Sequence, residues 1–169
     1  MKTSWYRDDM KSAKVVLLIT LLGLVLVDAK IYKKCNLAKE LVEKLGFSRT
    51  LVSMWMCMIV AENKELDTKK VAEYKPLVTT GASPYKSYGL FQINSQHYCR
   101  VGYVGGFCKM RCEDLLTDDI KKSAQCAQIV LNKEGFKAWK QWEAKCKPPQ
   151  SNPPAVNNCF EKSAKVIAG

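Results

Sequence analysis

The sequence predicts an α+β domain in which helices flank a small β segment and disulfide bonds hold the elements together. Three observations support this class. Helical periodicity occurs on both sides of one strand-like segment, Tyr85–Ser95. The chain of 169 residues contains eight cysteines, all of them after an apolar N-terminal segment. An even number of cysteines behind such a segment predicts disulfides formed in an oxidising compartment, although their spacing leaves the pairing open.

The first 29 residues are typical of a signal peptide. A charged segment precedes an unbroken apolar run, Val15–Val27, and Val27 and Ala29 then occupy the −3 and −1 positions of a cleavage site. The 13 apolar residues of this run fall short of the roughly 20 that a membrane-spanning helix needs. We therefore expect a secreted protein whose domain begins at Lys30. An uncleaved membrane anchor is the alternative.

The chain carries a formal net charge of +11 at neutral pH. A secreted basic domain concentrates at polyanions, so we expect an anionic bacterial surface among its partners. Nucleic acid is not expected, because the sequence contains no nucleic-acid-binding motif and the cysteines indicate an extracellular location. We expect a monomer. A soluble surface without any specific partner is the alternative interpretation of the charge.

Two helices are predicted before the strand-like segment. In Cys35–Phe47, leucines and a valine recur at helical spacing between charged residues, and Gly46 is expected to end the helix. Leu51–Glu62 is apolar nearly all round, which predicts a buried helix. We interpret its methionines as core filling. A disulfide at Cys57, in the middle of this helix, would join it to another element.

The region around the strand-like segment is expected to be mostly loop. Residues 63–83 are polar and mixed, which predicts a long loop with little regular structure. Pro84 marks the entry to Tyr85–Ser95, which we interpret as a short strand, a turn at Gly89 and a return. Residues 100–111 contain several glycines and cysteines and are predicted to form a second loop.

Two further helices are predicted after the second loop. The first begins at Thr117–Asp119, with a hydroxyl cap and acids in the first turn, and runs to about Asn132. The second is short and covers Phe136–Ala144, where aromatic residues recur every three positions. Residues 147–158 are rich in proline and asparagine and are predicted to be irregular, and residues 160–169 form a separate tail.

Three motifs together resemble the C-type lysozyme family, which includes α-lactalbumin. The motif YGLFQINS stands at Tyr88–Ser95, and AWKQW stands at Ala138–Trp142. The spacing C-x3-C-x13-C runs from Cys108 to Cys126. The resemblance covers Lys30–Cys159. It implies a lysozyme-like fold with a helical domain, a small antiparallel β-sheet and four disulfides.

The resemblance also implies a disulfide pairing. Carried over residue by residue, the family's pairing would join Cys35 with Cys159, Cys57 with Cys146, Cys99 with Cys112 and Cys108 with Cys126. Residues 115–120 are similar to the arthropod branch of the family.

The family's chemistry needs two carboxyl groups at a β-1,4 glycosidic bond. One protonates the leaving oxygen, and the other acts as nucleophile or as base for water. The resemblance implies that Glu62, seven residues after Trp55, is the acid. Lysozyme is the best-known case of a glutamate whose pKa is raised in an apolar pocket against a tryptophan, and Trp139 matches that tryptophan by motif. A surface glutamate at a helix end is the alternative for Glu62.

The second carboxylate that the resemblance implies is missing. It would stand directly before Tyr88–Gly89, and the sequence has Ser87 there. A serine hydroxyl carries no charge to stabilise an oxocarbenium-like transition state, and it is a poor nucleophile without an adjacent base. The loss is expected to cost on the order of 10²–10³ in rate. The sequence therefore leaves open whether the protein is a working enzyme.

Two ways around this loss remain open. Glu65, Asp67 or Glu73, in the loop after the buried helix, could supply the base of an inverting mechanism. Alternatively, Glu62 alone could support a weak, water-assisted hydrolysis.

Sugar binding is implied by five residues. Gln92 and Asn94 match family positions that line the cleft, and Trp139 joins them. His97 and Tyr98 stand where the family usually has indoles, and they would stack or hydrogen-bond with less area. The alternative for Tyr98 is a surface aromatic beside a disulfide, and for His97 an exposed titratable group.

No cofactor and no metal ion are expected. His97 is the only histidine and the sequence has no CxxC pair, which argues against a zinc site. A calcium site found in some relatives would need further acids after Asp118 and Asp119, where the sequence has Lys122 and Ser123. We interpret the two acids as charges at a helix N-terminus.

Three hypotheses for function follow. The protein is a muramidase of normal or weak activity, a silent glycan-binding protein that recognises peptidoglycan or another glycan containing N-acetylglucosamine, or a cationic antibacterial protein that acts by charge. Fold alone does not choose among them.

Overall fold

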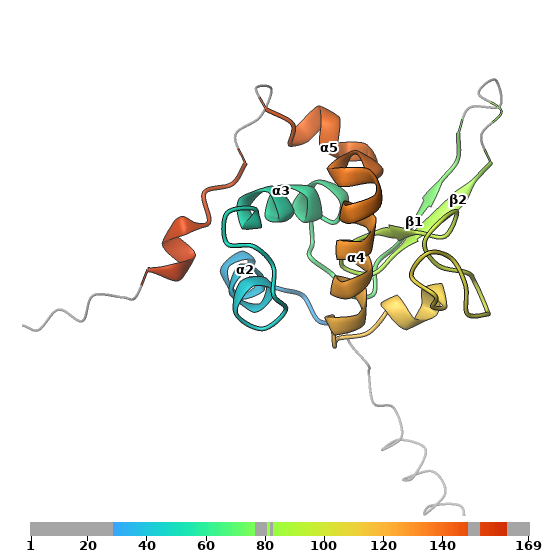
Figure 1. The fold of residues 1–169 in the computed structure, drawn as a ribbon, viewed down its shortest axis with the longest axis horizontal. Helices are drawn as coiled ribbons and strands as arrows, with labels where there is room; N and C mark the ends of the chain where they lie inside the picture. Colours follow the sequence, from blue (N-terminus) through green and yellow to red (C-terminus); the bar gives the residue numbers. More distant parts are fainter. Residues whose placement is uncertain (1–28, 77–80, 82, 149–152, 162–169) are drawn as a thin grey trace, which may run out of the picture.

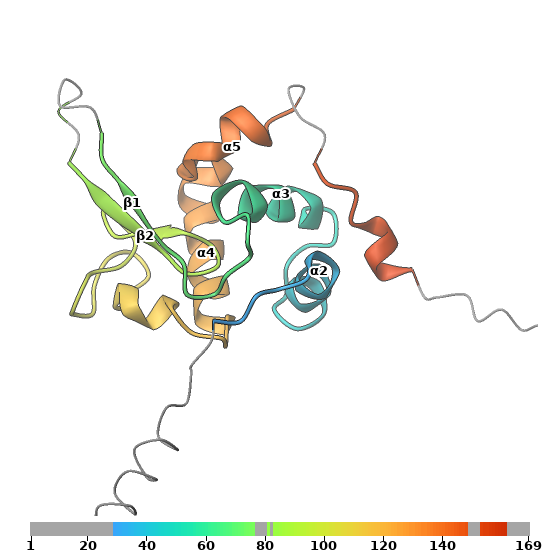
Figure 2. The same ribbon diagram turned by 180° about the vertical axis from the view of Figure 1, so that it is seen from behind.

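Helices form one side of the molecule and a small sheet forms the other (Figures 1 and 2). The computed structural model describes residues 29–76, 81, 83–148 and 153–161. All of the predicted signal segment except Ala29, and most of the predicted C-terminal tail, lie outside the described residues. Within the described ranges, no helix is long and apolar enough to cross a membrane. The predicted α+β class is confirmed.

The two predicted N-terminal helices are present as α2, Lys34–Glu43, and α3, Val52–Glu62. After α2 the chain turns at Gly46, whose φ is +72°. Helix α3 is nearly encased by the rest of the molecule, because apolar side chains cover all its faces. Met56 and Met58 are buried in the core, as their interpretation as core filling requires.

The sheet has three antiparallel strands in the order β1-β2-β3. They are β1, Val71–Tyr74, β2, Tyr85–Tyr88, and β3, Ile93–Asn94. Strands β2 and β3 are the predicted strand and return. Strand β1 corrects the prediction that residues 63–83 have little regular structure. Its four residues pair with β2, and this partner stabilises a strand too short to be recognised from its own sequence.

The turn between β2 and β3 depends on Gly89. Its φ is +71°, and a Cβ atom there would overlap the carbonyl oxygen of Leu115. Leu115 ends the short 3-10 helix η2, Cys112–Leu115. Glycine is therefore required by both the backbone conformation and the close approach.

Helix α4, Lys121–Glu134, begins later than predicted. The carboxylate of Asp119 accepts the backbone N–H of Lys121 at 3.0 Å, just before the helix. Asp118 accepts instead from the Thr68 hydroxyl at 2.6 Å and from the backbone N–H of Lys30 at 3.0 Å. The two acids therefore hold the chain that precedes α4, and neither lies in its first turn.

The predicted helix over residues 136–144 is two elements. The 3-10 helix η3, Gly135–Ala138, is followed by α5, Lys140–Lys145. Trp139 between them has an extended backbone, with φ −98° and ψ 122°. The last short element is the 3-10 helix η4, Asn157–Phe160, in the region predicted to be irregular.

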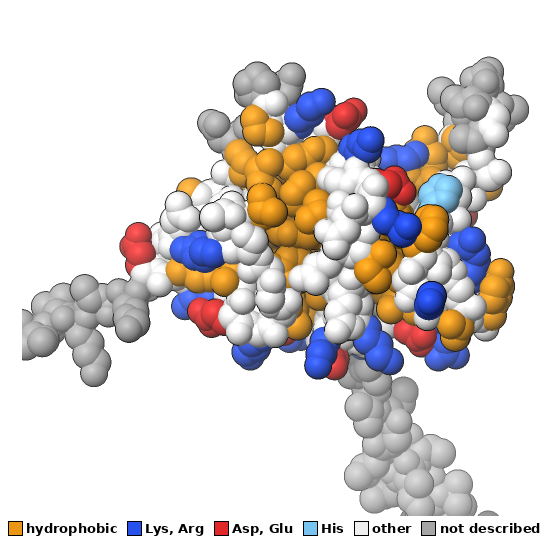
Figure 3. Space-filling model, viewed as in Figure 1, with side chains coloured by type: hydrophobic (Ala, Val, Ile, Leu, Met, Phe, Trp, Pro, Cys, Tyr) orange, Lys and Arg blue, Asp and Glu red, His pale blue; other side chains and the backbone are white. Residues whose placement is uncertain are grey.

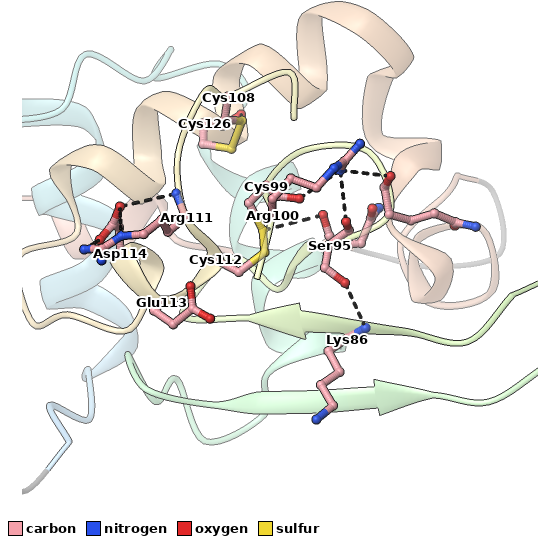
Figure 4. The surroundings of a disulfide bond; sticks show 12 residues. Lys86, Ser95, Cys99, Arg100, Cys108, Arg111, Cys112, Glu113, Asp114 and Cys126 are labelled. Atoms are coloured by element: carbon pink, nitrogen blue, oxygen red, sulfur yellow. Dashed lines mark hydrogen bonds and ion pairs between the residues drawn. A yellow bond between two sulfur atoms is a disulfide. The ribbon is translucent and has the colours of Figure 1, made fainter. Parts of the chain in front are cut away.

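Four disulfides join these elements, with the pairing that the resemblance implied. Cys35–Cys159 connects α2 to η4, and Cys57–Cys146 connects α3 to the end of α5. In the loop after β3, Cys99 is bonded to Cys112 of η2 and Cys108 to Cys126 of α4. Figure 4 shows the last two, with the Arg100 guanidinium donating to the Ser95 carbonyl at 3.1 Å.

Candidate active-site cleft

A cleft of about 320 Å³ lies between the sheet and the segment from η3 into α5, with the end of α3 at its floor. Seven residues were predicted as catalytic or sugar-binding. Five of them line this cleft: Glu62, Ser87, Gln92, Asn94 and Trp139. The structure thus brings together positions that lie far apart in the sequence.

Glu62 is the last residue of α3 and is half-buried. Its Oε1 atom accepts the backbone N–H of Gln141, at the start of α5, at 2.7 Å. Burial raises the pKa of Glu62 above its ordinary value, although the Gln141 hydrogen bond and the charges of nearby lysines oppose the shift. A carboxyl group with this balance keeps its proton to higher pH than an exposed glutamate.

Trp139 connects the cleft to the core. Only 4% of its surface is exposed, and its indole N–H donates to the carbonyl of Phe91 at 2.7 Å. Its ring lies 5.7 Å from that of Trp55 in an edge-to-face arrangement. The extended backbone at Trp139 directs the chain from η3 into α5 and so places Gln141 against Glu62.

Ser87 stands on β2 and faces the cleft from the opposite wall. Its neighbour on β1 is Ala72, and its neighbour on β3 is Asn94. Neither neighbour carries a charge. At this point of the sheet, therefore, the cleft wall has no acid from any of its three strands.

The three loop acids considered as substitutes lie in different places. Glu65 pairs with Lys70 at 3.5 Å, and Asp67 accepts the backbone N–H of Lys69 at 2.7 Å. Only Glu73 is at the cleft. Because side chains alternate along a strand, the side chain of Glu73 lies on the face of the sheet opposite to that of Ala72 and Ser87. Its carboxylate pairs there with Lys75 at 3.0 Å.

Gln92 and Asn94 line the cleft in different ways. Gln92 is 4% exposed, and its amide nitrogen donates to the carbonyls of Gly89 at 2.8 Å and Lys70 at 3.2 Å. It therefore braces the β2–β3 turn, where its own φ is +49°. Asn94 is half-exposed, and its side-chain oxygen accepts the backbone N–H of His97 at 3.1 Å.

His97 and Tyr98 do not line this cleft. His97 is exposed, as its alternative interpretation had it. Tyr98 is 1% exposed, and its hydroxyl donates to the carboxylate of Glu134 on α4. The expected stacking of Tyr98 on a sugar ring is thus corrected, and so is the alternative of a surface aromatic. The ring lies in the core, where the hydrogen bond to Glu134 holds its hydroxyl.

Sequence reasoning missed a contact across one end of the cleft. Tyr74 and Tyr85 are paired in the β1–β2 register, with their ring centroids 4.9 Å apart. The ammonium of Lys140 lies 2.7 Å from the Tyr74 centroid and 5.1 Å from that of Tyr85. We call these three residues the lysine–tyrosine clasp. Lys140 lies within the AWKQW motif, but nothing in the sequence predicts its partners.

The described part of the chain contains no set of side chains suited to bind a metal ion. No group of three or more His, Cys, Asp and Glu side chains there is placed to hold an ion.

Sequence comparisons with known proteins point to one family. A profile of the C-type lysozyme/alpha-lactalbumin family matches residues 30–159. The chain is similar to the lysozyme of Bombyx mori, with 37% identity over 133 residues that cover 78% of this chain and 88% of that protein. It is 36% identical to the lysozyme of Hyalophora cecropia, covering 86% and 99% of the two chains. It is 35% identical to lysozyme C of Halichoerus grypus, covering 86% and 98%.

Proposed function

The chain belongs to the C-type lysozyme/alpha-lactalbumin family, and we propose that it binds the β-1,4-linked N-acetylmuramic acid/N-acetylglucosamine glycan of bacterial peptidoglycan in the cleft, with hydrolysis weak or lost. Membership of the family supports a glycan-hydrolase or glycan-binding role. The observation that carries the finer proposal is the uncharged sheet wall at Ser87, across the cleft from a well-placed Glu62.

Glu62 has what a general acid needs. Its raised pKa favours the protonated form that gives a proton to the leaving glycosidic oxygen, and the Gln141 N–H holds the carboxyl group in place. The second catalytic group is absent, because position 87 is a serine. No fixed negative charge meets the positive charge that develops on the sugar ring, and no carboxylate is available to attack it. Binding survives this change, whereas turnover falls.

Turnover and binding by the purified secreted protein test the proposal. We expect saturable binding of peptidoglycan fragments, with cell-wall hydrolysis on the order of 10²–10³ below that of a lysozyme with both carboxylates. Glu62→Gln should remove any residual hydrolysis and keep binding. Glu143→Gln is the matched control, because its carboxylate lies on α5 and pairs with Lys147 at 3.6 Å. Full turnover by the wild type, or no binding, would refute the proposal.

Secretion is part of the proposal. Four disulfides support a protein that matures in an oxidising compartment, with residues 1–29 removed, a domain over 30–159 and a tail over 160–169. N-terminal sequencing of the protein released by expressing cells should begin at Lys30. A start at Met1 in a membrane fraction would favour the anchor instead.

A cationic antibacterial role is the second candidate, supported by the net charge of +11. This role predicts that the Glu62→Gln variant kills bacteria as well as the wild type does. It also predicts that killing decreases with added salt. Killing that disappears with Glu62→Gln would reject this candidate.

A further inference from the structure

The ionisable residues at the cleft leave it with an excess of positive charge. Of its two acids, Glu62 and Glu73, only Glu62 faces the two lysines that line the cavity. One oxygen of the Glu62 carboxyl group already accepts the Gln141 N–H at 2.7 Å. The carboxylate of Glu73 is paired with Lys75 on the other face of the sheet.

The two lysines at the cleft are in a different situation. Lys140 and Lys145 both line the cavity and are exposed. Among the ion pairs of the described residues, none includes either ammonium group. In Figure 3, Lys and Arg side chains lie at the edge between α5 and the hairpin of β1 and β2, with acidic side chains beside them.

The lysine–tyrosine clasp places one of these charges where a ligand must meet it. Lys140 reaches from α5 across to Tyr74 and Tyr85 on the hairpin, so its ammonium stands over the rings that would otherwise offer a flat stacking surface to a sugar. A neutral sugar gains that surface only by displacing the cation, without a charge to offer in return. A sugar with an anionic group can pair with the cation instead.

We infer that the cleft selects a glycan bearing an anionic substituent, a carboxylate or a sulfate, which the ammonium groups of Lys140 and Lys145 bind. The inference rests on the proposed function, because it names the class of glycan that the same cleft takes. It also gives the replacement at Ser87 a consequence for binding: a carboxylate at that position would repel the substituent that the lysines attract.

Calorimetric titration of the purified secreted protein with three tetrasaccharides tests the inference. The probes are chitotetraose, which is neutral, a hyaluronan tetrasaccharide, which carries carboxylates, and sulfated chitotetraose. At physiological salt we expect the acidic probes to bind about tenfold more tightly than chitotetraose. Tighter binding of only the hyaluronan probe identifies the substituent as a carboxylate, and tighter binding of only the sulfated probe identifies it as a sulfate. Tighter binding of both means that the cleft recognises negative charge of either kind.

Three variants separate a specific contact from general attraction. Lys140→Gln should bring the affinity ratio of acidic to neutral probe close to one, and Lys140→Arg should keep it. Lys86, which Figure 4 shows on β2, is paired with Glu73 and so lies on the face of the sheet that Glu73 occupies. Lys86→Gln removes the same charge there and should leave the ratio unchanged. If Lys140→Gln does not fold, Lys145→Gln serves in its place.

Each outcome decides one claim. Equal affinities for all three probes overturn the inference and leave the proposed function standing, since chitotetraose is then bound. An equal loss of preference with Lys86→Gln also overturns it. Binding of no probe also overturns the inference, and the titration with peptidoglycan fragments then decides separately whether the proposed function stands.

Discussion

The two walls of the cleft are held in place by different means. On the helical wall, the side chains at the cavity also hold the core together: Trp139 bonds to Phe91, and Glu62 bonds to the start of α5. On the sheet wall, Ala72 and Ser87 are half-buried, and no side-chain hydrogen bond in the described structure involves Ser87. Substitutions at the cavity on the helical wall should therefore lower stability, whereas residues on the sheet wall can be replaced with little effect on stability.

This difference means that the residue at position 87 can change without disturbing the fold. The backbone of β2 is positioned by its pairing with β1 and by the close approach of Gly89 to Leu115. None of these contacts needs a carboxylate at position 87. The following experiments test the contrast between the walls.

Ser87→Asp should have the largest effect. It adds a carboxylate to the sheet wall opposite Glu62, so we expect cell-wall hydrolysis to rise on the order of 10²–10³, measured as kcat/KM. The same change in a Glu62→Gln background should give no rise, because the acid is then absent. If Ser87→Asp folds and remains inactive, the two walls are not set at a catalytic separation.

Trp139→Phe should be the most costly change to stability. It leaves the buried carbonyl of Phe91 without its donor, which should lower the free energy of unfolding by about 1–3 kcal/mol and the Tm by several degrees. Ser87→Ala on the other wall should cost less than about 0.5 kcal/mol. Thermal unfolding of both variants checks the contrast, and equal losses would contradict it.

The pH dependence of stability should reveal Glu62. Because its pKa is raised in the folded state above the ordinary value of 4.5, the folded protein binds the proton more tightly than the unfolded chain. Its contribution is complete below pH 4.5 and is lost as pH rises through the folded-state pKa. The Tm of Glu62→Gln, which mimics the protonated form, should therefore rise relative to the wild type towards neutral pH. A Tm difference between the two proteins that does not change with pH would contradict a raised pKa of Glu62.

Glu73→Gln should have the smallest effect. Its carboxylate lies on the far face of β1, so any hydrolysis, in the wild type or with Ser87→Asp, should change less than about twofold. A loss comparable to that of Glu62→Gln would instead identify Glu73 as the second acid.

Local pattern was sufficient for much of the fold. The apolar composition of α3 and the helical periodicity of α2 are properties of the segments themselves, so both helices could be predicted. Strand β1 could not, because its hydrogen-bonding partner lies beyond a long connection. The start of α4 was misplaced, because Asp118 and Asp119 are equally suited to capping a helix and to holding the chain before it.

The site divides in the same way. Family motifs located Glu62, Ser87 and Trp139, and the structure puts all three at one cavity. Motifs did not reveal that Tyr98 turns inward to Glu134, because side-chain direction next to a disulfide depends on the whole loop. The lysine–tyrosine clasp was invisible for a similar reason, since it joins α5 to a strand that itself was not predicted.

The disulfide between Cys35 and Cys159 bears on how well the protein withstands proteolysis. It closes a loop with a sequence separation of 124, and a crosslink of that length restricts the unfolded chain by on the order of 5 kcal/mol. Small domains are stable by only about 5–15 kcal/mol in all. Because proteases cleave a chain when it unfolds briefly, this bond should slow proteolysis by lowering the population of the unfolded state.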